Sequence, residues 1–211
     1  MPERFRIIAL AMAAVFICYI DRVVISLTII PMGEELGWSN TEKGIVLGSF
    51  YIAYMVTQIY GGILSDRIGA KIILGVGLIT WSLFTLVTPL AAAAGFTILI
   101  LARLGMGLGE GVTFPAWHSL YARWIPKSER SRAVAATNSA IPLGTIFGLV
   151  VTPIIIIELS WQWAFYLYGA IGFVWYIFWS KYVSSSPTDS STISQKELTY
   201  ITDNAPASGP G

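Results

Sequence analysis

Apolar residues fill long stretches of this chain, and short polar segments that hold most of the charged residues separate these stretches. A helix needs about 20 predominantly apolar residues to cross the hydrocarbon core of a bilayer, which is roughly 30 Å thick. Stretches of about that length occupy residues 7–30, 45–64, 72–90, 96–122, 133–157 and 163–183. The pattern therefore predicts an all-α, polytopic membrane protein with a bundle of six transmembrane helices.

The first apolar stretch allows two interpretations. Arg4 and Arg6 precede apolar and small residues, as in a secretory signal peptide. The apolar pattern resumes after Asp21 and Arg22, however, and continues to Ile30, which is too long for the core of a signal peptide. We therefore expect an uncleaved first transmembrane helix.

The overall composition agrees with a surface that faces lipid. Hydrophobic residues make up 55% of the 211 residues, charged residues make up 12%, and the mean hydropathy is +0.68. A soluble domain of this length could not bury so many apolar side chains in one core.

The positive charges fall on one side of the expected bilayer. If the chain crosses six times, one side carries Arg4, Arg6, Arg67, Lys71, Arg123, Lys127, Arg130, Arg132 and Lys181. The opposite side carries Lys43, beside Glu34, Glu35, Glu42 and Glu158. By the positive-inside rule, we expect the amino terminus and the segment after residue 183 to be cytoplasmic.

The composition changes at the end of the sixth stretch. We assign residues 1–183 to the six-helix bundle and residues 184–211 to a cytoplasmic linker. Within the linker, Ser194 and Glu197 have capping-box spacing, which predicts a short amphipathic helix near residues 194–203. The Pro-, Gly- and Ser-rich end reads as flexible linker, so we expect the chain to be a fragment.

Glycine and proline mark helix contacts and bends. Small-residue pairs at four-residue spacing are Gly105 with Gly109, Gly107 with Gly111, and Gly144 with Gly148. Such pairs let helices approach closely, and we interpret most of them as packing. Pro115, Pro142 and Pro153 interrupt helical stretches, where they either gate a cavity or act as passive bends.

Four ionisable residues lie well inside the predicted helices: Asp21, Arg22, Arg103 and Glu110. Each costs roughly 2.5–3.5 kcal/mol near the centre of a membrane helix unless it is paired or hydrated. A position facing lipid is therefore excluded. Arg22 and Arg103 both lie ~11–12 Å below the same membrane boundary, so their guanidinium groups are expected to meet.

These charges allow a structural and a functional interpretation. Asp21 with Arg103, or Glu110 with Arg22, could form ion pairs that only stabilise the bundle. Alternatively, the arginines hold an anion by bidentate contacts while a carboxylate gains and loses a proton. On the second interpretation Arg22, which adjoins Asp21, is the main substrate contact, and Arg103 and Tyr51 are further substrate-binding candidates.

His118 lies near the cytoplasmic end of the fourth stretch. An imidazole there could relay protons. On spacing alone, a packed or capping histidine is the simpler interpretation.

Residues 62–71, Gly-Ile-Leu-Ser-Asp-Arg-Ile-Gly-Ala-Lys, resemble the loop between the second and third helices of the major facilitator superfamily. Ala70 stands where that family usually has a basic residue. The resemblance implies a twelve-helix fold of two six-helix halves, of which this chain would be the amino-terminal half. It also implies a conformational or gating role for a set of loop residues, Gly62, Asp66, Arg67, Gly69 and Lys71.

A narrower resemblance, to the anion:cation symporter branch of that superfamily, runs across nearly the whole chain. The residues that carry it are Arg103 and the segments 19–22, 107–118, 124–126, 129–132, 161–166 and 193–197. In that branch the residue matching Arg22 contacts the anion, those matching Asp21 and Glu110 are associated with proton coupling, and those matching Arg103 and His118 are functionally sensitive. Cys18 stands where the branch often has asparagine.

The leading functional hypothesis is therefore proton-coupled symport of an organic anion, such as a sugar acid or another carboxylate. An anion uniporter or exchanger would use the same arginines without a titrating carboxylate, and a non-transporting membrane partner domain is a third possibility. We expect a small organic anion, protons, the lipid bilayer and a missing carboxy-terminal half as partners, and no nucleic acid. No cofactor, metal site or enzyme motif is indicated. We place the protein in a bacterial inner membrane, and the sequence does not choose among glucarate, galactonate, hexuronate, phosphate and glutamate.

Overall fold

The computed structural model describes residues 2–204, so the end of the expected linker, residues 205–211, lies outside the described residues. Helices make up the fold, and the described residues contain no strand. The long helices are α1 (Glu3–Glu35), α2 (Asn40–Leu64), α3 (Ala70–Ala94), α4 (Phe96–Gly111), α5 (Thr113–Trp124), α6 (Lys127–Glu158) and α7 (Trp161–Tyr182). Two helical turns, η1 (Ser65–Gly69) and η2 (Pro187–Asp189), and the short α8 (Gln195–Asp203) complete the order.

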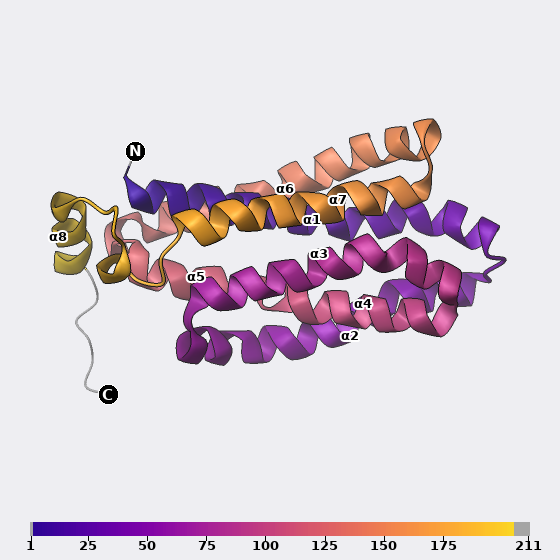
Figure 1. Ribbon diagram of the computed structural model, residues 1–211, viewed down its shortest axis with the longest axis horizontal. Coiled ribbons are helices and arrows are strands. Elements are labelled where there is room, and N and C mark those ends of the chain that lie inside the picture. Colours follow the sequence, from indigo (N-terminus) through magenta and orange to yellow (C-terminus); the bar gives the residue numbers. More distant parts are fainter. Residues whose placement is uncertain (1, 205–211) are drawn as a thin grey trace.

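Successive long helices run in opposite directions along the molecule, with α4 and α5 following one another in a single pass (Figure 1). The passes correspond to the six apolar stretches, which confirms the prediction of an all-α six-helix bundle. Each pass extends further than its apolar stretch at one end or at both. Helical hydrogen bonding continues into the polar segments, where apolar character has already ended.

Within residues 2–204, four helical segments could cross a membrane by length and composition: Glu3–Glu35, Asn40–Ala94, Phe96–Trp124 and Lys127–Glu158. The second of these joins α2 and α3, because the backbone between them stays helical through η1. Figure 1 shows that α2 and α3 nevertheless run in opposite directions. Helix α7 is rich in Trp and Tyr, whose polar atoms lower its hydropathy. These two features explain why this count is smaller than the number of passes.

The segment expected to be a loop, residues 62–71, is instead helical. Its centre forms the π-helical turn η1, and Gly69 ends the turn with a φ of 110°. A side chain at that φ is disfavoured, so glycine is the residue that allows this reversal between α2 and α3.

The pass made of α4 and α5 is interrupted at Val112, three residues before Pro115. Proline has no amide hydrogen to donate to the carbonyl of Gly111, and its ring crowds that carbonyl. The helix therefore ends at Gly111 and restarts at Thr113.

Glycines bring α4 into close contact with both of its neighbours. A Cβ atom on Gly107 would lie 3.0 Å from the backbone nitrogen of Tyr54 in α2, and one on Gly109 would lie 2.7 Å from the backbone nitrogen of Trp81 in α3. Gly148 of α6 packs in the same way against Val23 of α1. These contacts agree with the interpretation of the glycines as packing residues.

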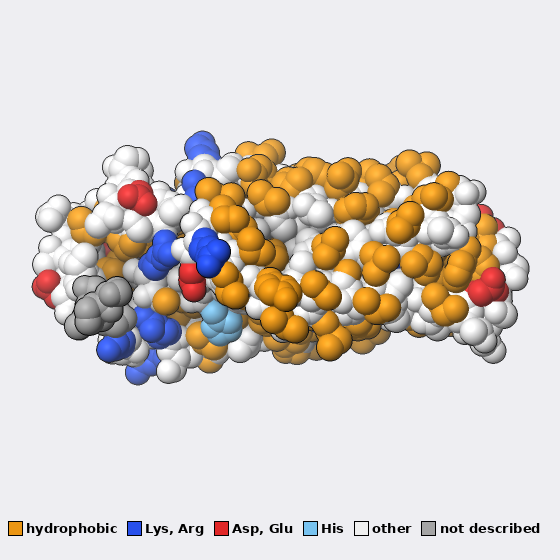
Figure 2. All heavy atoms as spheres, turned by 90° about the horizontal axis from the view of Figure 1, so that it is seen from below, with side chains coloured by type: hydrophobic (Ala, Val, Ile, Leu, Met, Phe, Trp, Pro, Cys, Tyr) orange, Lys and Arg blue, Asp and Glu red, His pale blue; other side chains and the backbone are white. Residues whose placement is uncertain are grey.

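Large apolar side chains remain exposed along the middle of the molecule, and α2 and α6 carry many of them. On these two helices they are Ile45, Tyr51, Ile52, Met55, Val56, Ile59, Tyr60, Ile63, Leu64, Leu143, Ile146, Phe147, Leu149, Val150, Ile154 and Ile157. Figure 2 shows hydrophobic side chains over most of one face, with Lys and Arg gathered toward one end. Such a surface suits lipid and a further helical partner rather than water.

The end of the molecule that carries most of the positive charge is shared by the start of α1, η1, the junction of α5 and α6, and the end of α7 (Figure 1). The tertiary structure thus gathers the lysines and arginines as the six-pass topology requires. At the opposite end, Ser39 and Glu42 form a capping box that begins α2. The hydrogen bonds from the backbone and hydroxyl of Ser39 hold the pKa of Glu42 below its usual range.

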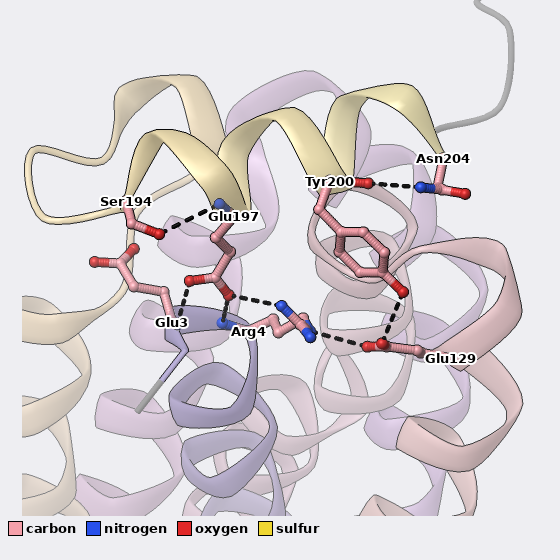
Figure 3. Close-up of polar contacts among 7 residues, drawn as sticks. All are labelled: Glu3, Arg4, Glu129, Ser194, Glu197, Tyr200 and Asn204. Atoms are coloured by element: carbon pink, nitrogen blue, oxygen red, sulfur yellow. Dashed lines mark hydrogen bonds and ion pairs between the residues drawn. The ribbon is translucent and has the colours of Figure 1, made fainter.

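Helix α8 lies in the range where a short helix is expected, and it is docked on the bundle. The Glu197 carboxylate accepts hydrogen bonds from the backbone amides of Glu3 (2.9 Å) and Arg4 (3.1 Å), and so caps the start of α1. Arg4 pairs with Glu197 (3.3 Å) and with Glu129 of α6 (2.9 Å). The Tyr200 hydroxyl also donates to Glu129, at 3.0 Å (Figure 3). The tail helix therefore links the starts of α1 and α6.

Candidate functional site

A pocket of about 230 Å³ lies between α1, α2 and α4. Its lining residues are Asp21, Arg22, Ile25, Ser26, Leu47, Phe50, Tyr51, Arg103 and Met106. The fold thus brings together the three substrate-binding candidates and one of the proton-coupling candidates, which the sequence distributes over three helices.

Arg22 is engaged by a carboxylate from another helix. Its Nε donates to Oε1 of Glu110, and the two side chains form an ion pair. Glu110 is completely buried, and its Oε2 has no hydrogen-bond partner among residues 2–204. Of the two structural ion pairs considered from the sequence, this is the one that the structure contains.

Arg103 has no such carboxylate partner. Its side chain is buried, and it forms no ion pair with any carboxylate of the described residues. One terminal nitrogen, Nη1, donates to the sulfur of Met106 at 3.0 Å, which is a weak acceptor, and Nε has no partner in the same part of the chain. The pocket therefore contains a buried cation whose hydrogen-bonding capacity is largely unused.

The ring of Phe50 in α2 is close to both guanidinium groups. Its ring centroid is 5.1 Å from Cζ of Arg103 and 5.8 Å from Cζ of Arg22. Arg22 also faces the rings of Tyr54 (4.5 Å) and Tyr19 (5.0 Å). The negative faces of these rings attract the cations and offset part of their mutual repulsion. No single residue pattern in the sequence indicated this aromatic wall.

The Asp21 carboxylate accepts a hydrogen bond from a neutral donor on another helix. The indole Nε1 of Trp81 in α3 donates to Oδ2 of Asp21 at 3.1 Å. The other oxygen, Oδ1, has no hydrogen-bond partner within residues 2–204, although Asp21 lines the pocket. The alternative pair of Asp21 with Arg103 is not formed.

Cys18, at the position where asparagine is expected from the resemblance, contacts the same carboxylate as Arg22. Its Sγ donates to Oε1 of Glu110 at 3.1 Å, and the thiol is buried. One oxygen of Glu110 thus accepts two hydrogen bonds while the other accepts none that the described residues supply.

The remaining site candidates lie away from the pocket. His118 is exposed and stacks on Trp117, with a ring-centroid distance of 3.7 Å. In and beside η1, Asp66 accepts a hydrogen bond from Ser119 of α5 (2.7 Å), and Lys71 donates to the carbonyl of Ser180 in α7 (3.3 Å). Gly62, Arg67 and Gly69 belong to the same helical reversal. These residues can couple helix ends to one another, and they do not touch the pocket.

The charges of the site are balanced when all four groups are ionised, with two guanidinium groups and two carboxylates. Because the site is buried, a change in the number of charges costs far more than it would in water. Within the described residues, no group of three or more His, Cys, Asp or Glu side chains is arranged to hold a metal ion. Chemically, the arrangement offers an anion the donors of a guanidinium group that no carboxylate of the described residues engages.

The model of the Major Facilitator Superfamily matches residues 11–208. The chain belongs to this superfamily. Its members in the comparison are transporters, not enzymes, in agreement with the absence of catalytic motifs.

Relatives with curated names are anion transporters, which agrees with the branch identified from the sequence. The chain is 40% identical to an ascorbate transporter of Arabidopsis thaliana chloroplasts over 200 residues, 95% of this chain and 37% of that protein. It is 39% identical to the chloroplast sodium-dependent phosphate transport protein 1 of the same plant over 209 residues, 99% of this chain and 41% of that protein. The chain therefore spans about two fifths of these relatives. Their names place them in chloroplasts, so the expected bacterial inner membrane finds no support here.

Solved structures share the fold. The xylose transporter XylE from E. coli, in a partially occluded inward-open conformation, matches with a TM-score of 0.80 at 17% identity, over 94% of this chain and 54% of that one. A bacterial homolog of the human lysosomal transporter Spinster matches with a TM-score of 0.78 at 21% identity, over 89% and 46%. The membrane bundle thus corresponds to about half of a complete transporter.

Proposed function

We propose that this chain forms one wall of a secondary transporter that carries a small organic anion together with a proton. The observation that carries the proposal is Arg103, a buried guanidinium group without a carboxylate partner, beside a second arginine in the same pocket. A planar guanidinium group binds a carboxylate or phosphate by two parallel hydrogen bonds. Phosphate, named for one relative, fits this chemistry directly, and ascorbate, named for another, is an enolate that offers two adjacent oxygens to the same donors.

Arg103 is the first contact for the anion in this arrangement. Arg22 is neutralised by Glu110, so its capacity for an anion is limited while Glu110 is ionised. A proton on Glu110 removes that negative charge and releases Arg22 toward the pocket. The two arginines then hold the anion together, beside the Phe50 ring.

Charge balance supports coupling to protons. A monoanion that enters the balanced site leaves one uncompensated negative charge in a medium of low dielectric constant. One proton on Glu110 or Asp21 restores the balance, so the anion and the proton each favour binding of the other. A uniporter or exchanger driven by membrane potential would need no such step, and it is the alternative that the experiment must separate.

The proposal requires a second six-helix half. The pocket is lined from α1, α2 and α4, and a second half would close the cavity and recognise the non-anionic part of the substrate. We also propose that the positively charged end of the bundle, with α8, faces the cytoplasm or its equivalent compartment.

Uptake into proteoliposomes that contain the full-length protein tests the proposal. We expect an inward proton gradient, with the outside more acidic than the vesicle interior, to drive accumulation of an organic anion. Ascorbate, glutamate and galactonate are the first candidates, and inorganic phosphate is tested beside them. Arg103→Gln should abolish uptake. If accumulation follows membrane potential and ignores the pH gradient, uniport replaces symport; if Arg103→Gln transports like wild type, the assigned site is wrong.

A further inference from the structure

We infer that Trp81 is a positioning residue for proton transfer at Asp21, although it does not line the pocket. The inference rests on the proposed function for its role in transport, but its structural claim stands without it. The claim is that the indole N–H of Trp81 fixes the Asp21 carboxylate so that the other oxygen, Oδ1, faces the pocket.

Several contacts restrict the position of Trp81. Its side chain is fully buried, and Nε1 lies 3.1 Å from Oδ2 of Asp21, which is 60 residues away in the sequence. The backbone of Trp81 packs against Gly109 of α4, where a Cβ atom would come within 2.7 Å of its nitrogen. The indole therefore has little freedom to move, and the carboxylate is held against a rigid support.

The next turn of α3 contacts Met106, the hydrogen-bond partner of Arg103. Thr85 is fully buried, four residues after Trp81, and its hydroxyl lies 3.8 Å from the sulfur of Met106. The same sulfur accepts the hydrogen bond from Nη1 of Arg103. Residues at this spacing share a helix face. One face of α3 thus carries Trp81, which contacts Asp21, and Thr85, which contacts the methionine sulfur that Arg103 also contacts.

A neutral donor is the suitable partner for a carboxylate that must change its protonation state. A guanidinium group at Oδ2 would hold Asp21 in its ionised form, whereas an indole N–H can donate to the carboxylate and to the carbonyl oxygen of the acid. The charged or titratable groups close enough to interact electrostatically with Asp21 are Glu110 and Arg103 on α4, Tyr168 on α7, and Cys18 on its own helix. Arg22 follows Asp21 directly in the chain and lines the same pocket. Trp81 orients Asp21 among them without adding a charge.

Infrared spectroscopy of the full-length protein in lipid nanodiscs tests the inference. The C=O stretch of protonated Asp21 appears during acid titration and is identified by its loss in Asp21→Asn. In Trp81→Phe we expect this band to move to higher frequency, because the carbonyl loses its hydrogen bond. Trp117→Phe is the matched control, since Trp117 is equally buried and its Nε1 has no hydrogen-bond partner in residues 2–204.

A second replacement keeps the test informative if Trp81→Phe does not fold. Benzothienylalanine at position 81 keeps the shape of the ring system and replaces the N–H by sulfur, so it should give the same band shift. The inference is overturned if neither replacement moves the Asp21 band, or if Trp117→Phe moves it equally.

Transport measured in parallel separates the two claims. Trp81→Phe should lower proton-driven accumulation several-fold more than Trp117→Phe. A band shift without anion uptake in the wild type would refute the proposed function and leave the structural claim intact. Proton-driven uptake in the wild type, with no shift of the Asp21 band in Trp81→Phe, would refute the structural claim and leave the proposed function intact.

Discussion

Arg22 on α1 and Glu110 on α4 form an ion pair in the interior of the bundle, across 88 residues of sequence. Next to them, Arg103 lies in the same pocket as Arg22 without a carboxylate partner among the described residues. The sequence favours Arg22 as the main substrate contact, whereas in the structure Arg103 is the arginine that no carboxylate of the described residues engages. The predictions below follow from this difference and from the contacts that hold the bundle together.

Arg103→Lys should raise KM for the anion about 10-fold to 100-fold in the full-length protein, because hydrogen bonds to charged groups contribute about 1.5–3 kcal/mol. Lysine keeps the charge but loses the planar pair of donors. Arg22→Lys should have a smaller effect on KM, because Glu110 already pairs with Arg22, and a larger effect when it is combined with Glu110→Gln. Initial-rate uptake measures this, with the exposed Arg132→Lys as control. Equal effects of Arg22→Lys with and without Glu110→Gln would contradict the release of Arg22.

Glu110→Gln should separate substrate exchange from proton-driven accumulation. Glutamine resembles the protonated acid, so the variant should still exchange labelled for unlabelled anion in counterflow. It should lose accumulation driven by a pH gradient. The exposed Glu158→Gln should keep both activities. If Glu110→Gln accumulates substrate as well as wild type does, coupling belongs to Asp21 or to the other half.

Glu110→Ala should destabilise the fold by about 3–5 kcal/mol, because it leaves Arg22 buried without its partner. The double replacement Arg22→Met with Glu110→Leu should recover most of this loss, since apolar residues can replace a buried ion pair at little cost. Thermal unfolding in detergent checks both variants. A double variant as unstable as Glu110→Ala would show that the unpaired Arg22 does not cause the destabilisation.

Glu197→Gln should loosen α8 from the bundle, because a neutral amide is a weaker cap for α1 and a weaker partner for Arg4. Hydrogen exchange should rise at the start of α1 and throughout α8, while α4 stays protected. Replacement of the exposed Asp203 by Asn is the control. Unchanged exchange in Glu197→Gln would mean that apolar contacts such as that of Ile201 hold α8 in place.

Cysteine labelling of intact membranes should place residues 33–42 and residues 124–132 on opposite sides. The single native cysteine, Cys18, is buried, so it should give little background labelling. An impermeant reagent added from outside should modify the first segment only, and Cys18→Ala serves as the background strain. Labelling of the second segment alone would invert the proposed orientation.

Much of the architecture follows from local sequence patterns. Apolar stretches longer than a bilayer require helices, since only internally hydrogen-bonded segments are stable in lipid. Other features can also be read from short stretches of sequence. They are the charges at the ends of the apolar stretches, the capping residue Ser194 of α8 and the spacing of the glycines in α4. The sequence also identified Asp21, Arg22 and Arg103 as pocket residues, because buried charges cannot face lipid.

The partners of those charges depended on the tertiary structure. Whether Arg22 meets Glu110, or Asp21 meets Arg103, is set by the rotation and register of α1 against α4, which no local pattern encodes. The same holds for the hydrogen bond from Trp81 to Asp21 and for the contacts of Phe50 with the two guanidinium groups. A tryptophan or phenylalanine in an apolar stretch gives the same sequence pattern whether it faces lipid or a charge. The helical reversal at η1 was missed because Gly69 follows a polar segment that resembles an ordinary loop. Sequence therefore determined which groups must be buried in this protein, and packing between distant helices decided what each of them contacts.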